Sequence, residues 1–271
     1  MKEKMRIVIK VGTSTLTHDS GALNLQRIEH MARVLADLHG MGHEVILVSS
    51  GAIAVGVAEL QMGARPTELR YKQAAAAVGQ CNIMHIYDKL FGEYSCSVAQ
   101  ILLTGDDVDD PIRAEHLSNT FSALLEMGVI PIVNENDSVS SAEIETGHNK
   151  ILGDNDTLSA IVARLCRADL LVLLSDIDGL FDADPHSDPG AKLIPVVRTL
   201  TDEIQNLAGG SGTWRGTGGM ATKLNAAGIA MAAGVDMVIT NGKRMEDIYG
   251  IVDGQPIGTR FIAAERKEEQ P

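Results

Sequence analysis

Short aliphatic runs alternate regularly with longer amphipathic stretches along this chain, and this alternation limits the folds that it can adopt. The run RIVIKV at 6–11 stops at Gly12 and predicts a buried strand followed by a loop. Positions 24–38 place apolar residues at spacings of three or four, which predicts a helix, and HEVILV at 43–48 predicts the next strand. Because both strands are almost continuously apolar, they are typical of a parallel sheet that helices cover on both faces.

The same alternation continues along the rest of the chain. It predicts four more buried strands and a last edge strand, at 97–103, 129–133, 169–174, 235–240 and 258–263. It predicts helices at 69–90, 111–127, 158–167 and 219–233, with less regular segments at 105–110, 138–150 and 209–219. Alternating strands and helices without an internal repeat indicate an α/β protein.

Composition limits the partners and the compartment. The 271 residues suffice for one large domain or two modest lobes, and the scarcity of aromatic residues (3%) makes the core aliphatic. A net charge of −13 disfavours nucleic acid as a main partner, although it permits a small anionic ligand. The isolated cysteines are expected to be small buried hydrophobic residues: Cys81, Cys96 and Cys166. With no membrane-spanning run and no signal sequence, we expect a cytoplasmic enzyme or binding protein.

Two familiar nucleotide-binding fingerprints are missing. The chain has neither G-x-x-x-x-G-K-[ST] nor a G-x-G-x-x-G after its first expected strand. Their absence disfavours a P-loop enzyme and a NAD-binding Rossmann dehydrogenase. Phosphate binding stays open, because a helix N-terminus that follows a flexible loop binds anions.

Lys10 is the first residue with a chemical signature. It lies at the carboxyl end of an otherwise aliphatic strand, where open α/β sheets bind their ligands, although a lysine snorkelling from a strand end is the structural alternative. Ser49, Ser50 and Gly51 follow the second strand, and their hydroxyl and N–H groups suit a carboxylate or a phosphate. An ordinary helix cap is the simpler explanation of those three residues.

Acidic and amide side chains cluster after later strands. The sequence NEND at 134–137 exceeds what a turn requires, which makes Asp137 a candidate to hold a substrate ammonium. In GDND at 153–156 one acid serves as a helix cap and the other is left to orient a cation. Four more acids alternate in a loop that contacts a nucleotide or a metal, or else is a solvated turn: Asp176, Asp178, Asp182 and Asp184.

The clearest phosphate signal is the sequence TGGMATK at 217–223. Its glycines let backbone N–H groups approach phosphate oxygens, and Lys223 lies one turn inside the helix that follows. A plain helix start needs one glycine, so several glycines followed by a lysine favour a functional interpretation. Trp214 in the same loop either covers a ligand or lies on the surface.

Six motifs, taken together and in order, resemble the amino acid kinase family from about Ile7 to Ile262. They are Ile9–Ser14, Val48–Ile53, Val133–Asp137, Gly153–Asp156, Ser175–Leu180 and Gly216–Lys223. Thr13 stands where relatives acting on acetylglutamate or aspartate tend to have a second glycine. In that respect the chain is similar to the members that phosphorylate glutamate.

The resemblance implies an αβα sandwich with a mostly parallel central sheet, the fold shared with carbamate kinase. It implies one kinase domain at 1–262, with a glutamate-binding N-terminal lobe at about 1–170 and an ATP-binding C-terminal lobe at about 171–262. A polar tail at 263–271 follows. Family members often carry a C-terminal PUA domain, and we expect this sequence to lack it, either naturally or by truncation after Pro271.

Residue by residue, the resemblance implies a phosphoryl-transfer site. Lys10 and Lys223 would neutralise the transferred phosphoryl group, and Asp156 would hold both lysines in place. The residues that it implies for glutamate are Ser50, Asn134, Asp137 and Asn155. Those that it implies for ATP are Lys10, Gly12, Ser175, Asp176, Thr217, Gly218, Gly219, Met220, Ala221, Thr222 and Lys223. Mg²⁺ would travel with ATP, and no residue is assigned to a metal.

The activity implied by the resemblance is ATP-dependent phosphorylation of the γ-carboxylate of L-glutamate, which gives glutamyl 5-phosphate at the start of proline biosynthesis. A homo-oligomer (dimer or tetramer), feedback inhibition by proline and contact with the next enzyme of that pathway are further expectations, and neither nucleic acid nor membrane is an expected partner. The nearest alternative is a sister kinase acting on acetylglutamate, aspartate, carbamate or a nucleoside monophosphate. A non-catalytic anion sensor on the same fold is another, against which the retained Lys10, Asp156 and Lys223 argue.

Overall fold

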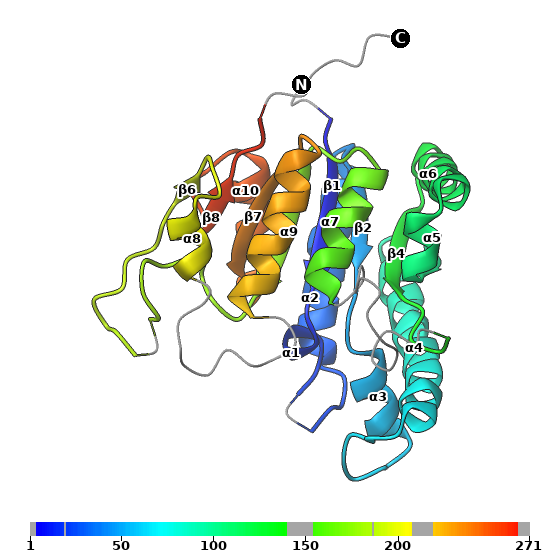
Figure 1. The fold of residues 1–271 in the computed structure, drawn as a ribbon. Helices are drawn as coiled ribbons and strands as arrows, with labels where there is room; N and C mark the ends of the chain where they lie inside the picture. The colour runs from blue at the N-terminus through cyan, green and yellow to red at the C-terminus, as the bar shows by residue number, and fades with distance from the viewer. Residues whose placement is uncertain (1–3, 19, 140–153, 186, 208–218, 265–271) are drawn as a thin grey trace.

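Eight strands form one sheet in the described part of the chain, in the order β3-β4-β2-β1-β5-β7-β8-β6 (Figure 1). The computed structural model describes residues 4–18, 20–139, 154–185, 187–207 and 219–264. The strands are β1 (Arg6–Val11), β2 (Glu44–Val48), β3 (Val98–Leu103), β4 (Ile130–Glu135), β5 (Leu170–Ser175), β6 (Val196–Val197), β7 (Asp236–Asn241) and β8 (Thr259–Phe261). Neighbouring strands pair in parallel except β7 and β8, so the mostly parallel sheet is confirmed.

Helices cover both faces of this sheet. They are α1 (Thr13–Leu16), α2 (Leu25–Gly40), α3 (Ala52–Glu59), α4 (Leu69–Glu93), α5 (Gly105–Asp109), α6 (Pro111–Glu126), α7 (Asn155–Leu165), α8 (Asp202–Leu207), α9 (Met220–Ala232) and α10 (Asp247–Val252). One core cluster joins the sheet to α6, α7 and α9, and the other joins it to α2, α3, α4 and α10. Figure 1 shows α7 and α9 side by side on one face. The αβα sandwich is therefore confirmed.

The alternation of side chains along β1 sets the direction of its lysine. Ile7, Ile9 and Val11 belong to the core on the α2 side, and Val8 belongs to the core on the α7 side. Because successive strand residues point to opposite faces, Lys10 points with Val8 toward α7 and α9. The sequence pattern thus places a charged side chain inside the layer that these two helices form with the sheet.

β1 lies at the centre of the sheet, where the order in which strands are added reverses. β1 pairs with β2 on one side and with β5 on the other, so later strands are added on both sides of β1. In open α/β sheets such a switch point leaves a crevice beyond the carboxyl ends of the strands. The two expected lobes meet near position 170 inside this continuous sheet, and the division into lobes stays a prediction.

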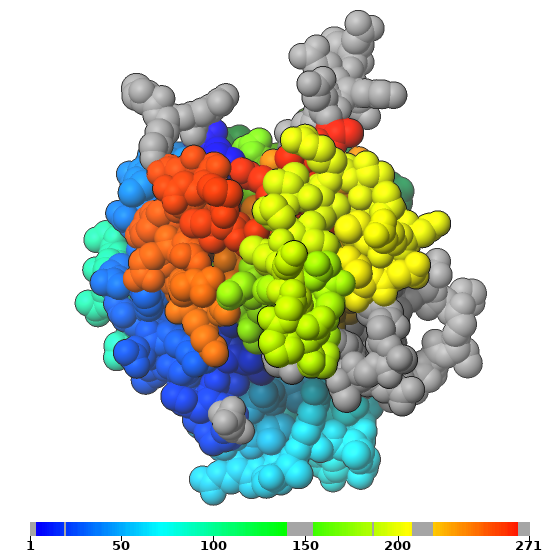
Figure 2. Space-filling view, turned by 90° about the vertical axis from the view of Figure 1, so that its left-hand side faces the viewer, coloured from blue at the N-terminus to red at the C-terminus, as the bar shows by residue number. Residues whose placement is uncertain are grey.

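The C-terminal segments are gathered on one side of the molecule. Figure 2 looks at this side, where the segments coloured from yellow to red form one continuous surface beside the blue N-terminal segments. β8 lies between β7 and β6, so the prediction that 258–263 forms an edge strand was wrong in position. Edge status follows from pairing order, which the local pattern does not encode.

None of the described helices is both long enough and apolar enough to span a membrane.

Several boundaries differ from the sequence predictions for identifiable reasons. β4 extends through Asn134 and Glu135, because both continue the parallel pairing with β3. α7 begins three residues before the expected Leu158, since Asp154 accepts hydrogen bonds from the first backbone N–H groups. The segment at 105–110 contains α5, which begins with a capping box from Thr104 and Asp107.

Four short elements and the burial of two cysteines also differ from the sequence predictions. The sequence pattern does not predict α1, α8, α10 or β6, which have two to six residues each. Elements this short lack the repeated apolar spacing on which prediction depends. Cys166 is buried as expected, whereas Cys96 is half-buried and Cys81 is exposed on α4.

Two glycines hold α3 and α4 in backbone contact. A Cβ atom added to Gly79 would lie 1.8 Å from the carbonyl oxygen of Ala52, and one added to Gly56 would lie 1.8 Å from that of Ala75. Both distances are far below van der Waals contact, so only glycine permits this approach. Because α3 follows the Ser49–Gly51 turn directly, the contact fixes the position of that turn relative to α4.

Candidate active site

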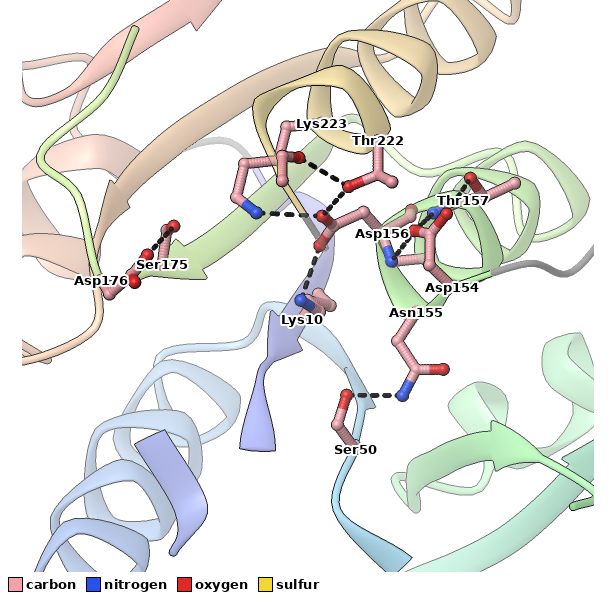
Figure 3. A network of polar contacts seen from close by, with 12 residues as sticks. Lys10, Ser50, Asp154, Asn155, Asp156, Thr157, Ser175, Asp176, Thr222 and Lys223 are labelled. Atoms are coloured by element: carbon pink, nitrogen blue, oxygen red, sulfur yellow. Dashed lines mark hydrogen bonds and ion pairs between the residues drawn. The ribbon is translucent and has the colours of Figure 1, made fainter. Parts of the chain in front are cut away.

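Two buried lysines share one buried carboxylate at the carboxyl end of β1 (Figure 3). Lys10 Nζ lies 2.6 Å from Asp156 Oδ1, and Lys223 Nζ lies 3.1 Å from Oδ2 of the same residue. The exposed fractions are 8% for Lys10, 6% for Lys223 and 1% for Asp156. The structure therefore brings together the three residues that the sequence analysis expected to be catalytic.

Electrostatics keep Asp156 ionised. Burial alone would raise the pKa of this carboxyl group, but the positive charges of Lys10 and Lys223 outweigh burial and hold the pKa below its ordinary value. Two ammonium groups thus face one carboxylate at the carboxyl end of a strand. Cationic side chains placed in this way are suited to binding a negatively charged ligand.

The first turns of α7 and α9 meet at this cluster. Asp154 caps α7 by accepting from the backbone N–H groups of Asp156 (2.8 Å) and Thr157 (2.9 Å). On α9, the Thr222 hydroxyl lies 2.9 Å from Asp156 Oδ2 and 2.7 Å from the carbonyl oxygen of Gly219. The positive ends of two helix dipoles thus converge where the lysines lie, which adds to the attraction for an anion.

Neutral polar groups form the other side of the site. The Asn155 side-chain amide donates to the Ser49 carbonyl oxygen (2.9 Å) and to the Ser50 hydroxyl, and it lies 3.3 Å from Asn134 Oδ1. Asn155 therefore contacts two of the other three residues expected to bind glutamate, Ser50 and Asn134. Asp137 lies half-buried in the turn after β4.

The two serines do not act as helix caps. α3 begins after Gly51, which adopts the left-handed conformation (φ 93°) and provides no side-chain cap. The Ser49 hydroxyl instead lies 2.9 Å from the Tyr87 hydroxyl, and the Ser50 hydroxyl contacts Asn155. The simpler explanation given by the sequence analysis, an ordinary N-cap, is therefore wrong for this pair.

Sequence reasoning missed two supporting residues on α4. Gln80 accepts a hydrogen bond from Asn134 (2.9 Å), and Tyr87 contacts Ser49. Burial raises the pKa of Tyr87 well above its ordinary value, and the hydrogen bond with Ser49 lowers it less, so the phenol stays protonated. The available signal was the position of Gln80 on the same helical stripe as Ala76 and Ile83, where a buried polar residue needs a partner.

The described residues among those expected to bind ATP lie at the carboxyl ends of β1 and β5 and at the start of α9. Ser175 ends β5 and is buried, Asp176 is exposed, and the Ser175 hydroxyl donates to Asp176 (3.1 Å). Gly12 lies beside the Lys10 ammonium, since a Cβ atom added to Gly12 would be 3.6 Å from it.

The glycine-loop residues are only partly described. Gly219 precedes α9, Ala221 is exposed, and the Met220 side chain is buried in the core, so only its backbone N–H is suited to a phosphate. Thr217, Gly218 and Trp214 lie outside the described residues.

No group of three or more His, Cys, Asp or Glu side chains suited to a metal was found among the described residues. Asp156 is occupied by two lysines, and Asp178 accepts from Asn241 (2.7 Å) and Arg244 (3.2 Å). These carboxylates are therefore arranged to hold cationic or amide side chains.

Comparison with known proteins is consistent with this geometry. Residues 5–241 match the model of the amino acid kinase family. The chain is 53% identical over 263 residues to "Glutamate 5-kinase" of Clostridium perfringens, and the match covers 97% of each chain. It is also 53% identical over 269 residues to "Glutamate 5-kinase" of Listeria monocytogenes, and this match covers 99% of this chain and 96% of the relative. A solved carbamate kinase from Giardia lamblia bound to AMP-PNP has the same fold, with a TM-score of 0.68, 17% identity and coverage of 97% and 100%.

Proposed function

The chain belongs to the amino acid kinase family, and from that premise we propose that it transfers the γ-phosphoryl group of ATP to the γ-carboxylate of L-glutamate, the first step of proline biosynthesis. The observation that carries the proposal is the buried pair of lysines on Asp156, next to the neutral cluster of Ser50, Asn134 and Asn155. The high identity to enzymes named for this reaction, over nearly their whole length, supports the choice of substrate.

The two lysines supply the charge that the reaction needs. Attacking carboxylate and transferred phosphoryl group are both anionic, and positioned cations stabilise such a transition state most. Lys10 comes from β1 and Lys223 from α9, so they approach the reacting group from two elements. Asp156 neutralises one of the two charges and keeps both ammonium groups at a fixed separation.

A general base is not required. The side-chain carboxylate of glutamate, with an ordinary pKa of about 4.3, is already ionised at neutral pH and attacks the phosphorus directly. The protein has to hold the two substrates in line and exclude water. This explains why the described site contains no His or Cys side chain among its contacts.

The acceptor binds on the neutral side of the site. Ser50, Asn134 and Asn155 provide hydrogen bonds to the amino acid, and Asp137 pairs with its α-ammonium. ATP, with its Mg²⁺, binds along Gly12, Ser175, Asp176 and the Gly219–Lys223 start of α9, where backbone N–H groups meet the phosphates. Thr217 and Gly218 complete the nucleotide side in this proposal.

The test is ATP turnover with hydroxylamine trapping over a panel of acids: L-glutamate, N-acetylglutamate, aspartate, carbamate and a nucleoside monophosphate. We expect a trapped acyl phosphate with L-glutamate alone. Turnover with another acceptor, or ADP release without hydroxamate formation, would refute the proposal. Proline inhibition, the dimer or tetramer, contact with the next pathway enzyme and the cytoplasmic location stay predictions.

A further inference from the structure

Three side-chain amides form a chain that runs from α4 to the acceptor side of the site. Gln80 Oε1 accepts from Asn134 Nδ2 at 2.9 Å, and Asn134 Oδ1 faces Asn155 Nδ2 at 3.3 Å. Gln80 and Asn134 are 8% and 3% exposed. At this depth each amide must present the correct atom to its neighbour, because a mismatch would place two donors or two acceptors together.

One backbone carbonyl sets the direction of the whole chain. The Ser49 carbonyl oxygen can only accept, and it lies 2.9 Å from Asn155 Nδ2, so the nitrogen of that amide must face Ser49. Asn134 must then present its oxygen to Asn155, and Gln80 must present its oxygen to Asn134.

We propose that Gln80 is a positioning residue for the amino-acid acceptor, acting by fixing the orientation of the Asn134 side-chain amide. The inference rests on the proposed function and assigns a role in it to a helix that does not touch the phosphoryl-transfer cluster. Without the Gln80 oxygen, Asn134 is free to turn over and to present its nitrogen to the nitrogen of Asn155. Asn134 then no longer presents its amide in a fixed orientation to the amino acid that it is proposed to bind.

The close packing of α4 brings Gln80 within hydrogen-bonding distance of Asn134. Gly79, the preceding residue, allows the helix to approach until its backbone touches the Ala52 carbonyl oxygen. Two helical turns after Gln80, Tyr87 contacts the Ser49 hydroxyl. α4 therefore supports the acceptor side at two points, one on β4 and one at the end of β2.

The test is the kinetic behaviour of Gln80→Met, which keeps a similar shape and removes the acceptor oxygen. We expect KM for glutamate to rise about tenfold or more, since a buried donor loses its partner, with KM for ATP and kcat within about twofold. In an Asn134→Ala background the same change should have almost no further effect on KM for glutamate. Gln80→Leu repeats the measurement if Gln80→Met is not recovered folded.

Gln73→Met is the matched control. Gln73 lies half-buried on the same helix without a contact to Asn134, so this variant should keep all three kinetic constants. The proposal would be overturned if Gln80→Met left KM for glutamate unchanged, or if it lowered kcat and raised both KM values together. It would also be overturned if the effects of Gln80→Met and Asn134→Ala on KM for glutamate were fully additive. Absence of glutamate phosphorylation by the unmodified protein would instead refute the proposed function, so the two failures are distinguishable.

Discussion

The two sides of the site are built from different chemistry. The side formed by β1, α7 and α9 holds three charged groups, Lys10, Asp156 and Lys223, all nearly inaccessible to solvent. The side formed by β2, β4 and α4, together with Asn155 from the first turn of α7, holds hydroxyl and amide groups that contact one another. Charge is concentrated where the proposed reaction moves charge, and neutral hydrogen bonds lie where a substrate must be recognised.

This difference has a thermodynamic basis. A buried ion cluster gains little stability for the fold, because desolvation offsets the attraction between its members. It acts strongly on a transition state whose charge it complements. Neutral amides cost less to bury and have directional donors and acceptors, so they discriminate between ligands of similar charge. The charged side should therefore control kcat, and the neutral side should control KM for the acceptor.

Lys223→Ala should have the largest effect and tests the charged side. Removing one stabilising group from the transition state lowers kcat roughly 10²–10³-fold. The variant should stay folded, because Asp156 keeps its contacts with Lys10 and Thr222. Steady-state kinetics and thermal unfolding measure both effects, with exposed Lys89→Ala on α4 as the control. A folded variant with unchanged kcat would remove Lys223 from the mechanism.

Gly79→Ala tests how far the neutral side depends on helix packing. The added methyl group would meet the Ala52 carbonyl oxygen, so α4 must shift, at a cost of about 1–3 kcal/mol of unfolding free energy. Thermal unfolding should show Tm lower by several degrees, and KM for glutamate should rise while KM for ATP does not. At Gly92, on the same helix, an added Cβ meets nothing within 4 Å, so Gly92→Ala should leave Tm unchanged or slightly higher. Equal Tm values for the two variants would contradict the close approach of α3 and α4.

Asp137→Ala should have the smallest effect of these three variants, and its effect should be confined to binding of the acceptor. Loss of one charge-assisted hydrogen bond raises KM for glutamate roughly tenfold, while KM for ATP stays the same. Initial-rate measurements with each substrate varied in turn separate the two constants. A selective rise in KM for ATP would reverse the assignment of the two sides.

The parts of the fold that sequence predicted well are those with a strong local signal. β1 agrees with its expected limits because a continuous aliphatic run ends at Gly12. The start of α7 was missed because the capping effect of Asp154 outweighs the polar character of Asn155 and Asp156. The extension of β4 depends on pairing with β3, which no local pattern records.

The same distinction applies to the site. Lys10, Asp156 and Lys223 were predictable because buried charge and a glycine-lysine helix start are unusual for an aliphatic protein. Gln80 and Tyr87 were missed because their role depends on how α4 packs against α3, β2 and β4. Cys81, on the exposed side of α4, was mispredicted for the same reason.

The central position of β1 has a consequence for the order in which the protein is completed during synthesis. The backbone N–H of Arg6 bonds to Asp169, 163 positions later in the sequence, and the β1–β5 pairing follows from there. The first strand therefore leaves the ribosome long before its second neighbour exists, and Lys10 has no buried counter-ion until Asp156 is translated. Such long-range pairing slows folding. Enzymatic activity should therefore appear late in folding, so the time at which activity appears reports when β5 pairs with β1.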